Sequence, residues 1–261
     1  MNAPVELPLL SVQGLHKRFG NRTACRDIDF DLWPGEVLGI VGESGSGKTT
    51  LLGCIAGHVE PSEGEIRYAA RDGSLIDLAV LAEADRRRKL GNDMGFVHQN
   101  PRDGLRLGMS AGANIGEPLM AAGLRHYGDI RRIAAEWLER VEIDPGRIDE
   151  NPRRFSGGMQ QRLQIARNLV TSPRLVLMDE PTGGLDVSVQ ARLLDLIRQL
   201  VADLGLAVIL VTHDLGVARL LAHRLMVMQD GNVVESGLTD QVLDDPHEAY
   251  TQLLVSSVLQ L

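Results

Sequence analysis

The stretch GESGSGKTT, at residues 42–50, constrains what this chain can fold into more than any other part of its sequence. It fits the pattern G-x-x-x-x-G-K-[ST], whose glycines let backbone N–H groups face phosphate oxygens. An apolar run ends at Val41 and a helical pattern begins near Lys48, so a strand, this loop and a helix follow one another. A glycine-rich turn that binds nothing does not require that order, and the sequence therefore predicts a phosphate-binding loop.

Two side chains of this loop have predictable roles. Lys48 places a positive charge against the β- and γ-phosphates of a nucleotide, and the Thr49 hydroxyl is a suitable ligand for Mg²⁺. The residues expected to contact a bound nucleotide are Gly42, Glu43, Ser44, Gly45, Ser46, Gly47, Lys48, Thr49 and Thr50.

Composition restricts the classes to which the chain can belong. Its 261 residues are 44% hydrophobic and 24% charged, as in an ordinary globular protein, and no apolar run approaches the roughly 18–20 residues of a membrane span. A formal net charge of −8 argues against broad binding to nucleic acid. Two cysteines, Cys25 and Cys54, are too few for a disulfide framework or a four-iron cluster. We therefore expect a soluble, cytoplasmic protein without a signal peptide.

Strand and helix patterns predict an α/β fold with a mainly parallel sheet core. Near the N-terminus, LLSVQGLHKRFG and DIDFDLWPGEVLGIVGESG alternate apolar and polar residues, which predicts an antiparallel β subdomain feeding the buried strand EVLGIVG. After Arg174, the continuous apolar runs RLVLMDE, LAVILVTHD and RLMVMQDG predict buried parallel strands. The helical pattern SVQARLLDLIRQLVADLG lies between the first two of these runs.

The middle of the chain has a helical character. In DIRRIAAEWLERV, apolar residues recur at helical spacing, at Ile130, Ile133, Ala134, Trp137, Leu138 and Val141. We interpret residues 1–261 as a single domain, with a helical subdomain at about 85–165 inserted in the core and a C-terminal tail at about 240–261. The basic run at residues 86–89 is either a docking patch or a solvated helix face beside Glu83 and Asp85.

Polar residues follow three of the predicted strands. Asp179 and Glu180 end the run LVLMDE, where ligands of parallel sheets bind; Asp179 would hold Mg²⁺ and Glu180 would polarise the attacking water. His213 ends the next strand, where it can contact a γ-phosphate. For Asp179 and Glu180 the alternative is a solvated loop, and the upstream phosphate loop favours the catalytic interpretation. For His213 the alternative is a structural histidine, and only its position at the strand end favours a catalytic role. Gln99, in GFVHQNP, either senses metal and phosphate or has no such role.

A second anion site is predicted at FSGGMQQRLQIAR, residues 155–167. Ser156, Gly157 and Gly158 precede a helical pattern, so unhindered backbone N–H groups lie at the positive end of a helix dipole. One chain would then carry two phosphate-binding elements that are far apart in the sequence.

These motifs, in this order, resemble the nucleotide-binding cassette of the ABC superfamily: the phosphate loop, Gln99, SGGM, LVLMDE, GGLD and THD. The resemblance covers about residues 9–250. It implies that two cassettes enclose two ATP molecules, with Ser156, Gly157 and Gly158 of each subunit closing over ATP held by the phosphate loop of the other. The second cassette would be an identical chain or a paralogue.

The same resemblance implies individual roles. Lys48, Glu180 and His213 would be catalytic, whereas Thr49, Gln99 and Asp179 would serve Mg²⁺. Phe19 would stack on adenine, unless it is a core residue, and Asp186 would belong to the nucleotide site.

Two departures from the family pattern stand out. The commonest signature is Leu-Ser-Gly-Gly-Gln, whereas Phe155 and Met159 flank Ser-Gly-Gly in this chain, as in subfamilies that resemble oligopeptide importers. The loop after the catalytic glutamate usually reads Ser-Ala-Leu-Asp, whereas this chain has Gly183 and Gly184 before Leu185. The missing hydroxyl puts in doubt any coupling between subunits through that side chain.

Further stretches, among them RHYGDIR and VVESGLTDQVLDDPHEAYTQLLVSSVLQL, resemble the ABC subunits of bacterial carbon–phosphorus lyase systems. This resemblance implies an ATPase that remodels a soluble lyase core during phosphonate catabolism and does not itself cleave the C–P bond. The alternative is the ATPase subunit of an importer for phosphonates or oligopeptides, which would bind a membrane permease. A DNA-repair ABC ATPase is disfavoured, because the segment between Gln99 and Ser156 is too short for a long coiled coil.

Overall fold

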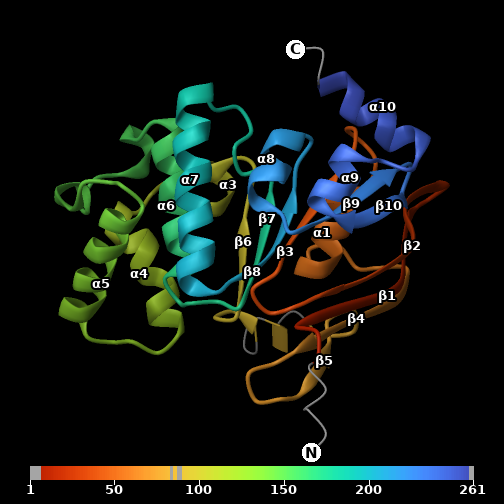
Figure 1. Cartoon of the computed structure of the whole chain (residues 1–261). Coiled ribbons are helices and arrows are strands. Elements are labelled where there is room, and N and C mark those ends of the chain that lie inside the picture. Colours follow the sequence, from red (N-terminus) through yellow and green to blue (C-terminus); the bar gives the residue numbers. More distant parts are fainter. Residues whose placement is uncertain (1–6, 83–84, 87–89, 259–261) are drawn as a thin grey trace, which may run out of the picture. The chain divides into compact units, whose positions relative to one another are not determined.

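The computed structural model describes residues 7–82, 85–86 and 90–258, and the chain divides into two compact units (Figure 1). The first unit comprises Met1–Arg88 and Gly205–Leu261, and the second comprises Lys89–Leu204. Of the predicted basic run, residues 87–89 and the neighbouring Glu83 lie outside the described residues. The predicted limits of the helical insertion, 85–165, stay a prediction.

An antiparallel sheet forms the N-terminal part of the first unit. Its strands are β1 (Leu10–Phe19), β2 (Arg22–Leu32), β4 (Glu63–Ala69) and β5 (Leu75–Asp77), in the order β2-β1-β4-β5. From Ile28 to Leu32, side chains on β2 alternate between a buried and an exposed face, as expected for a strand with one covered face. The predicted antiparallel β subdomain is confirmed.

A mostly parallel sheet forms the rest of the first unit. β3 (Val37–Val41) pairs in parallel with β8 (Ala207–Val211) and with β9 (Arg224–Gln229), and every residue of β3 and β8 is buried. The helices of this unit include α1 (Lys48–Ala56), α8 (Leu215–Leu221), α9 (Thr239–Asp244) and α10 (Ala249–Val258). Continuous apolar runs therefore became buried parallel strands, as predicted.

One strand of this sheet was not predicted. β10 (Asn232–Leu238) pairs antiparallel with β9 through a hairpin whose two loop residues, Asp230 and Gly231, have φ values of 49° and 82°. Asp-Gly is a strong sequence signal for such a two-residue turn, so the information needed to predict β10 was present.

The second unit combines two parallel strands with most of the long helices (Figure 1). β6 (Met94–Val97) pairs with β7 (Leu175–Asp179). The α-helices are α3 (Pro101–Gly104), α4 (Ala111–Ala121), α5 (Tyr127–Arg140), α6 (Gly157–Leu169) and α7 (Val187–Leu204); the short 3₁₀ helices are η1 (Pro145–Arg147) and η2 (Pro152–Arg154). On α5, the predicted apolar face is buried at Ile130, Ala134, Trp137 and Leu138.

Arg86, the described member of the basic run, fits neither predicted alternative. Its half-buried guanidinium donates hydrogen bonds to the carbonyl oxygen of Ile55, at 3.3 Å, and to that of Leu78. It therefore ties two parts of the first unit together and is not presented to a partner.

Both cysteines are buried and free, and neither is poised for reaction. Burial, with a smaller effect of the neighbouring Cys54, raises the pKa of Cys25 to about 12, and burial raises the pKa of Cys54 to about 11. The two groups therefore stay protonated at neutral pH. Among the described residues, no helix has the length and apolar character needed to cross a membrane.

Candidate functional site

The predicted phosphate loop leaves β3 and enters α1, as the sequence pattern required. Lys48 is 5% exposed, and its Nζ donates hydrogen bonds to the carbonyl oxygens of Gly42 and Glu43, both at 2.7 Å. The Lys48 ammonium group therefore lies against the backbone of the phosphate loop.

Glycine is required at two positions of this loop because other backbone segments approach it closely. Gly42 has a φ of 144°, and a Cβ there would lie 2.1 Å from the carbonyl oxygen of Met228. Gly47 has a φ of 108°, and its Cβ would lie 2.1 Å from the carbonyl oxygen of Ala24. Neighbouring backbone cannot yield as a flexible side chain does, so both positions of the motif require glycine for structural reasons.

Phe19 and His213 belong to the same unit as the phosphate loop. Phe19 ends β1 and is 51% exposed, with the Lys17 ammonium 4.7 Å from its ring centroid. An exposed ring rules out the alternative in which Phe19 is a core residue, and its stacking on adenine stays a prediction. His213 is exposed beyond the end of β8, beside Asp214, whose carboxylate caps α8 by accepting the N–H groups of Gly216 and Val217.

In the second unit, the structure brings Gln99 and Glu180 together. The Gln99 Nε2 donates a hydrogen bond of 3.0 Å to the Glu180 Oε2. Asp179 is the last residue of β7 and is 9% exposed, whereas Glu180 follows in a left-handed backbone conformation, with a φ of 43°. Such a φ is uncommon outside glycine and here turns the chain sharply after the strand. Asp186 is exposed and immediately precedes α7.

Ser156 is the N-cap of α6. Its Oγ accepts the backbone N–H of Met159 at 3.3 Å, while Ser156 and Gly157 themselves are exposed. A 13-residue helix thus presents its N-terminus at the predicted anion-binding element.

Phe155 and Met159, which replace the usual residues on either side of Ser-Gly-Gly, both contact one arginine. The Arg147 guanidinium lies 4.5 Å from the ring centroid of Phe155 and donates to the Met159 sulfur at 3.4 Å. Arg147 is in turn paired with Glu150 at 2.8 Å. Phe155 and Met159 therefore organise the chain around the start of α6 and leave Ser156 exposed.

Sequence reasoning missed a row of amide side chains on the buried face of α6. Gln164 Oε1 accepts the N–H of His98 at 2.7 Å, its Nε2 donates to the His98 carbonyl oxygen at 3.1 Å, and Asn168 Oδ1 accepts the N–H of Phe96 at 3.0 Å. Gln160, Gln164 and Asn168 recur every four residues, which is the helical spacing that could have revealed them. The helix that begins at Ser156 thereby holds the segment that leads to Gln99.

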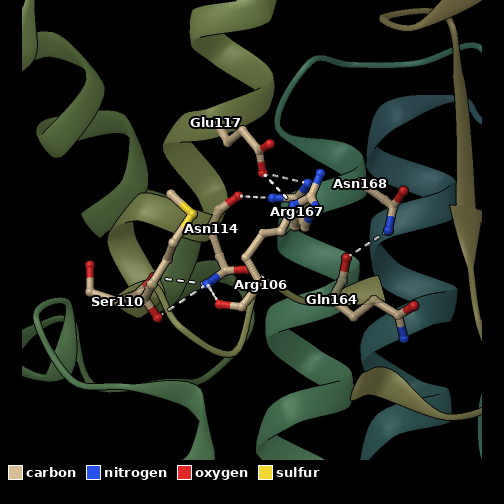
Figure 2. Close-up of polar contacts among 8 residues, drawn as sticks. Arg106, Ser110, Asn114, Glu117, Gln164, Arg167 and Asn168 are labelled. Carbon is tan, nitrogen blue, oxygen red and sulfur yellow. Dashed lines mark hydrogen bonds and ion pairs between the residues drawn. The ribbon is translucent and has the colours of Figure 1, made fainter. Parts of the chain in front are cut away.

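The segment after Gln99 is also tied to α6, by the contacts in Figure 2. Asn114 on α4 is fully buried; its Oδ1 accepts the N–H of Arg106 at 2.7 Å, and its Nδ2 donates to the carbonyl oxygen of Ser110 at 2.9 Å. Arg167 on α6 donates to the Asn114 carbonyl oxygen at 2.8 Å and pairs with Glu117 at 2.7 Å (Figure 2). Burial alone would raise the pKa of Glu117, but the hydrogen bond and charge of Arg167, with Arg106, lower it.

A family model described as ABC transporter matches residues 25–183, and the chain therefore belongs to the ABC transporter family. It is an ABC-type ATPase with the α/β cassette fold that the motifs predicted. The dimeric ATP-binding cassette MJ0796, in a post-hydrolysis state bound to ADP and Pi, matches with a TM-score of 0.77 and 31% identity, over 88% of this chain and 98% of that one.

Two curated relatives refine this placement. The chain is 68% identical over 253 residues to the putative phosphonates utilization ATP-binding protein PhnK of Escherichia coli (strain K12), covering 97% of this chain and 98% of the relative. It is 39% identical over 271 residues to a putative peptide import ATP-binding protein of Brucella melitensis biotype 1, covering 97% of this chain and 78% of that protein.

Gly183 and Gly184 offer a first test of the loop after Glu180. A Cβ at Gly183 would lie 3.3 Å from the Gln99 Nε2, an exposed side chain that can move, and 3.2 Å from the Glu180 carbonyl oxygen. A Cβ at Gly184 would meet nothing within 4 Å, but the φ of 73° is unfavourable for any residue with a side chain.

We therefore expect Gly184→Ala to lower the free energy of unfolding by roughly 1–2 kcal/mol, the usual cost of a left-handed residue. Gly183→Ala should cost less, about 0.5 kcal/mol, because the contacts with the Glu180 carbonyl oxygen and the Gln99 amide need shifts of only a few tenths of an ångström. Urea denaturation of the two variants and the parent measures both effects. The reverse ranking would show that crowding, and not backbone conformation, dictates glycine in this loop.

Proposed function

We propose that this protein binds and hydrolyses ATP as the ABC subunit of a phosphonate-utilisation system, in the cytoplasm, where it acts as a dimer on a soluble carbon–phosphorus lyase core. The observation that carries the proposal is the 68% identity, over nearly the full length of both chains, to a relative named for phosphonate utilisation. The peptide import relative is 39% identical, and this chain spans 78% of its length. An importer subunit that binds a membrane permease is the alternative, and the identities favour it less.

The proposed roles follow the sequence motifs and the local geometry of each unit. Residues 42–50 cradle the phosphates, with Lys48 as the cation, and Phe19 stacks on adenine. Glu180 polarises the attacking water and His213 contacts the γ-phosphate. Before that step Glu180 must exchange the Gln99 amide, 3.0 Å away, for water.

A magnesium ion fits the donor chemistry of three of these residues. The Thr49 hydroxyl, the Gln99 amide oxygen and the Asp179 carboxylate are oxygen ligands, which Mg²⁺ prefers, and they would hold the ion together with phosphate oxygens and water. When bound, Mg²⁺ neutralises charge that develops on the phosphates.

Glu180→Gln tests the catalytic assignment. The amide keeps the shape of the side chain but cannot accept a proton from water, so turnover should fall by about 10²–10⁴ while ATP binding persists. ATP should then accumulate in a dimer, visible by size-exclusion chromatography with multi-angle light scattering. Glu139→Gln, the same change on the exposed face of α5, is the control and should match the parent. Parental turnover in Glu180→Gln would remove Glu180 from the role of base.

The shared-site model gives a second test, by mixing two inactive variants. In a head-to-tail pair related by a two-fold axis, each Ser156 meets ATP held by Lys48 of the partner subunit, so there are two equivalent sites. Ser156→Arg and Lys48→Ala should each lack ATPase activity. In a mixed dimer one site carries both lesions and the other is intact, so the mixture should recover partial activity.

Two outcomes of the mixing experiment would contradict this model. One is a mixture that stays as inactive as its components although mixed dimers form. The other is a Ser156→Arg variant that hydrolyses ATP at the parental rate without dependence on protein concentration.

The partner is tested by affinity purification of the tagged protein from cells that use a phosphonate as phosphorus source. Mass spectrometry should identify soluble lyase subunits in the eluate, and cells grown on inorganic phosphate serve as the control. Recovery of a membrane permease instead would support the importer alternative and overturn the lyase proposal.

A further inference from the structure

The C-terminal helix contacts the phosphate loop directly. The hydroxyl of Tyr250, on α10, accepts the backbone N–H of Glu43 at 3.1 Å. The same peptide group contributes its carbonyl oxygen, that of Gly42, to the Lys48 Nζ at 2.7 Å. The peptide between Gly42 and Glu43 is therefore held at both ends, by Tyr250 on one side and by Lys48 on the other.

This peptide needs restraint from outside the loop. It follows Gly42, whose φ of 144° lies in a region open to glycine, and Glu43 is exposed, so neither neighbouring side chain restricts rotation of the peptide. If Lys48 turns toward a phosphate, its hold on the Gly42 carbonyl weakens. The hydrogen bond to Tyr250 then still holds the N–H end of the peptide.

Tyr250 is itself firmly positioned. α10 lies beside α9 and β10 (Figure 1), and the Glu235 carboxylate on β10 accepts the N–H groups of His247 at 2.9 Å and Glu248 at 3.2 Å, just before the helix begins. Thr251, the next residue after Tyr250, is 1% exposed. Although burial would raise the pKa of Glu235, the hydrogen bonds from the backbone N–H groups of His247 and Glu248 lower it, so the carboxylate anchor is charged at neutral pH.

We propose that Tyr250 is a positioning residue of the nucleotide site. By fixing the peptide between Gly42 and Glu43, it keeps the Gly42 carbonyl in place while that oxygen accepts from Lys48 and after Lys48 has turned toward the β- and γ-phosphates. The C-terminal helix thus belongs to the ATP-binding apparatus, although none of its residues lies within a nucleotide motif. The inference rests on the proposed role of Lys48 in binding ATP.

Tyr250→Phe removes the hydroxyl and keeps the ring. The Kd for MgATP, measured by isothermal titration calorimetry, should rise about three- to ten-fold, the range expected for one lost hydrogen bond. In turnover assays KM should rise by a similar factor and kcat should change less. The melting temperature without nucleotide should stay at the parental value. Leu253→Ala, on the same helix at a side chain that is 64% exposed, is the matched control and should leave Kd unchanged.

Two further variants, Tyr250→Leu and Lys48→Ala, distinguish a failure of the Tyr250 proposal from a failure of the proposed nucleotide site. If Tyr250→Phe binds MgATP as the parent does while Tyr250→Leu binds it weakly, the ring acts by packing and the proposal is overturned. A loss of affinity in Tyr250→Phe that accompanies a lower melting temperature overturns it as well. If Lys48→Ala keeps parental affinity and turnover, the proposed nucleotide site itself is wrong, whatever Tyr250→Phe does.

Discussion

Direct contact of backbone with backbone around the phosphate loop is the constraint on which the first unit depends. The loop passes so close to Met228 on β9 and to Ala24 on β2 that its two motif glycines admit no side chain. Gly231, in the turn after β9, donates its N–H to the Ser46 carbonyl oxygen at 3.0 Å and accepts the N–H of Arg26 at 2.8 Å. The unpredicted β9–β10 hairpin therefore joins the loop to both sheets of its unit, and Tyr250 adds a contact from the C-terminal helix.

In the second unit, α6 has a comparable organising role. It begins at the Ser156 cap, its middle holds His98 through Gln164, and near its end Arg167 reaches α4. One rigid element thus carries the predicted signature and also positions the segments on either side of Gln99. Through His98, the helix that Ser156 caps is thus connected to the segment of Gln99, whose side chain donates to Glu180.

Local patterns predicted the elements well, because strand and helix periodicity depends on neighbours in sequence. The buried parallel strands followed from continuous apolar runs, β1 and β2 from alternation of apolar and polar residues, and α1 and α5 from helical patterns, whereas β4 and β5 were not predicted. The proposed chemistry of Lys48 and Glu180 followed from motifs. The contacts that were missed join distant positions: Tyr250 and Glu43 are 207 residues apart, and Gln164 and His98 are 66 apart. No periodicity encodes such a pairing. Arg86 is a further example: its charge suggested a position on the surface, but its hydrogen bonds to the carbonyl oxygens of Ile55 and Leu78 are contacts that the sequence does not reveal.

The amide row of α6 also completes the hydrogen bonding of β6. Within the part of the chain that the structure describes, this strand is the last in its sheet, and no strand pairs with its side away from β7. The N–H groups of Phe96 and His98 on that side are taken by Asn168 and Gln164, and the His98 carbonyl accepts from the same glutamine. A helix thereby substitutes for the missing strand. These two N–H groups and one carbonyl group are therefore not free to pair with another polypeptide, which disfavours β-sheet extension at this edge.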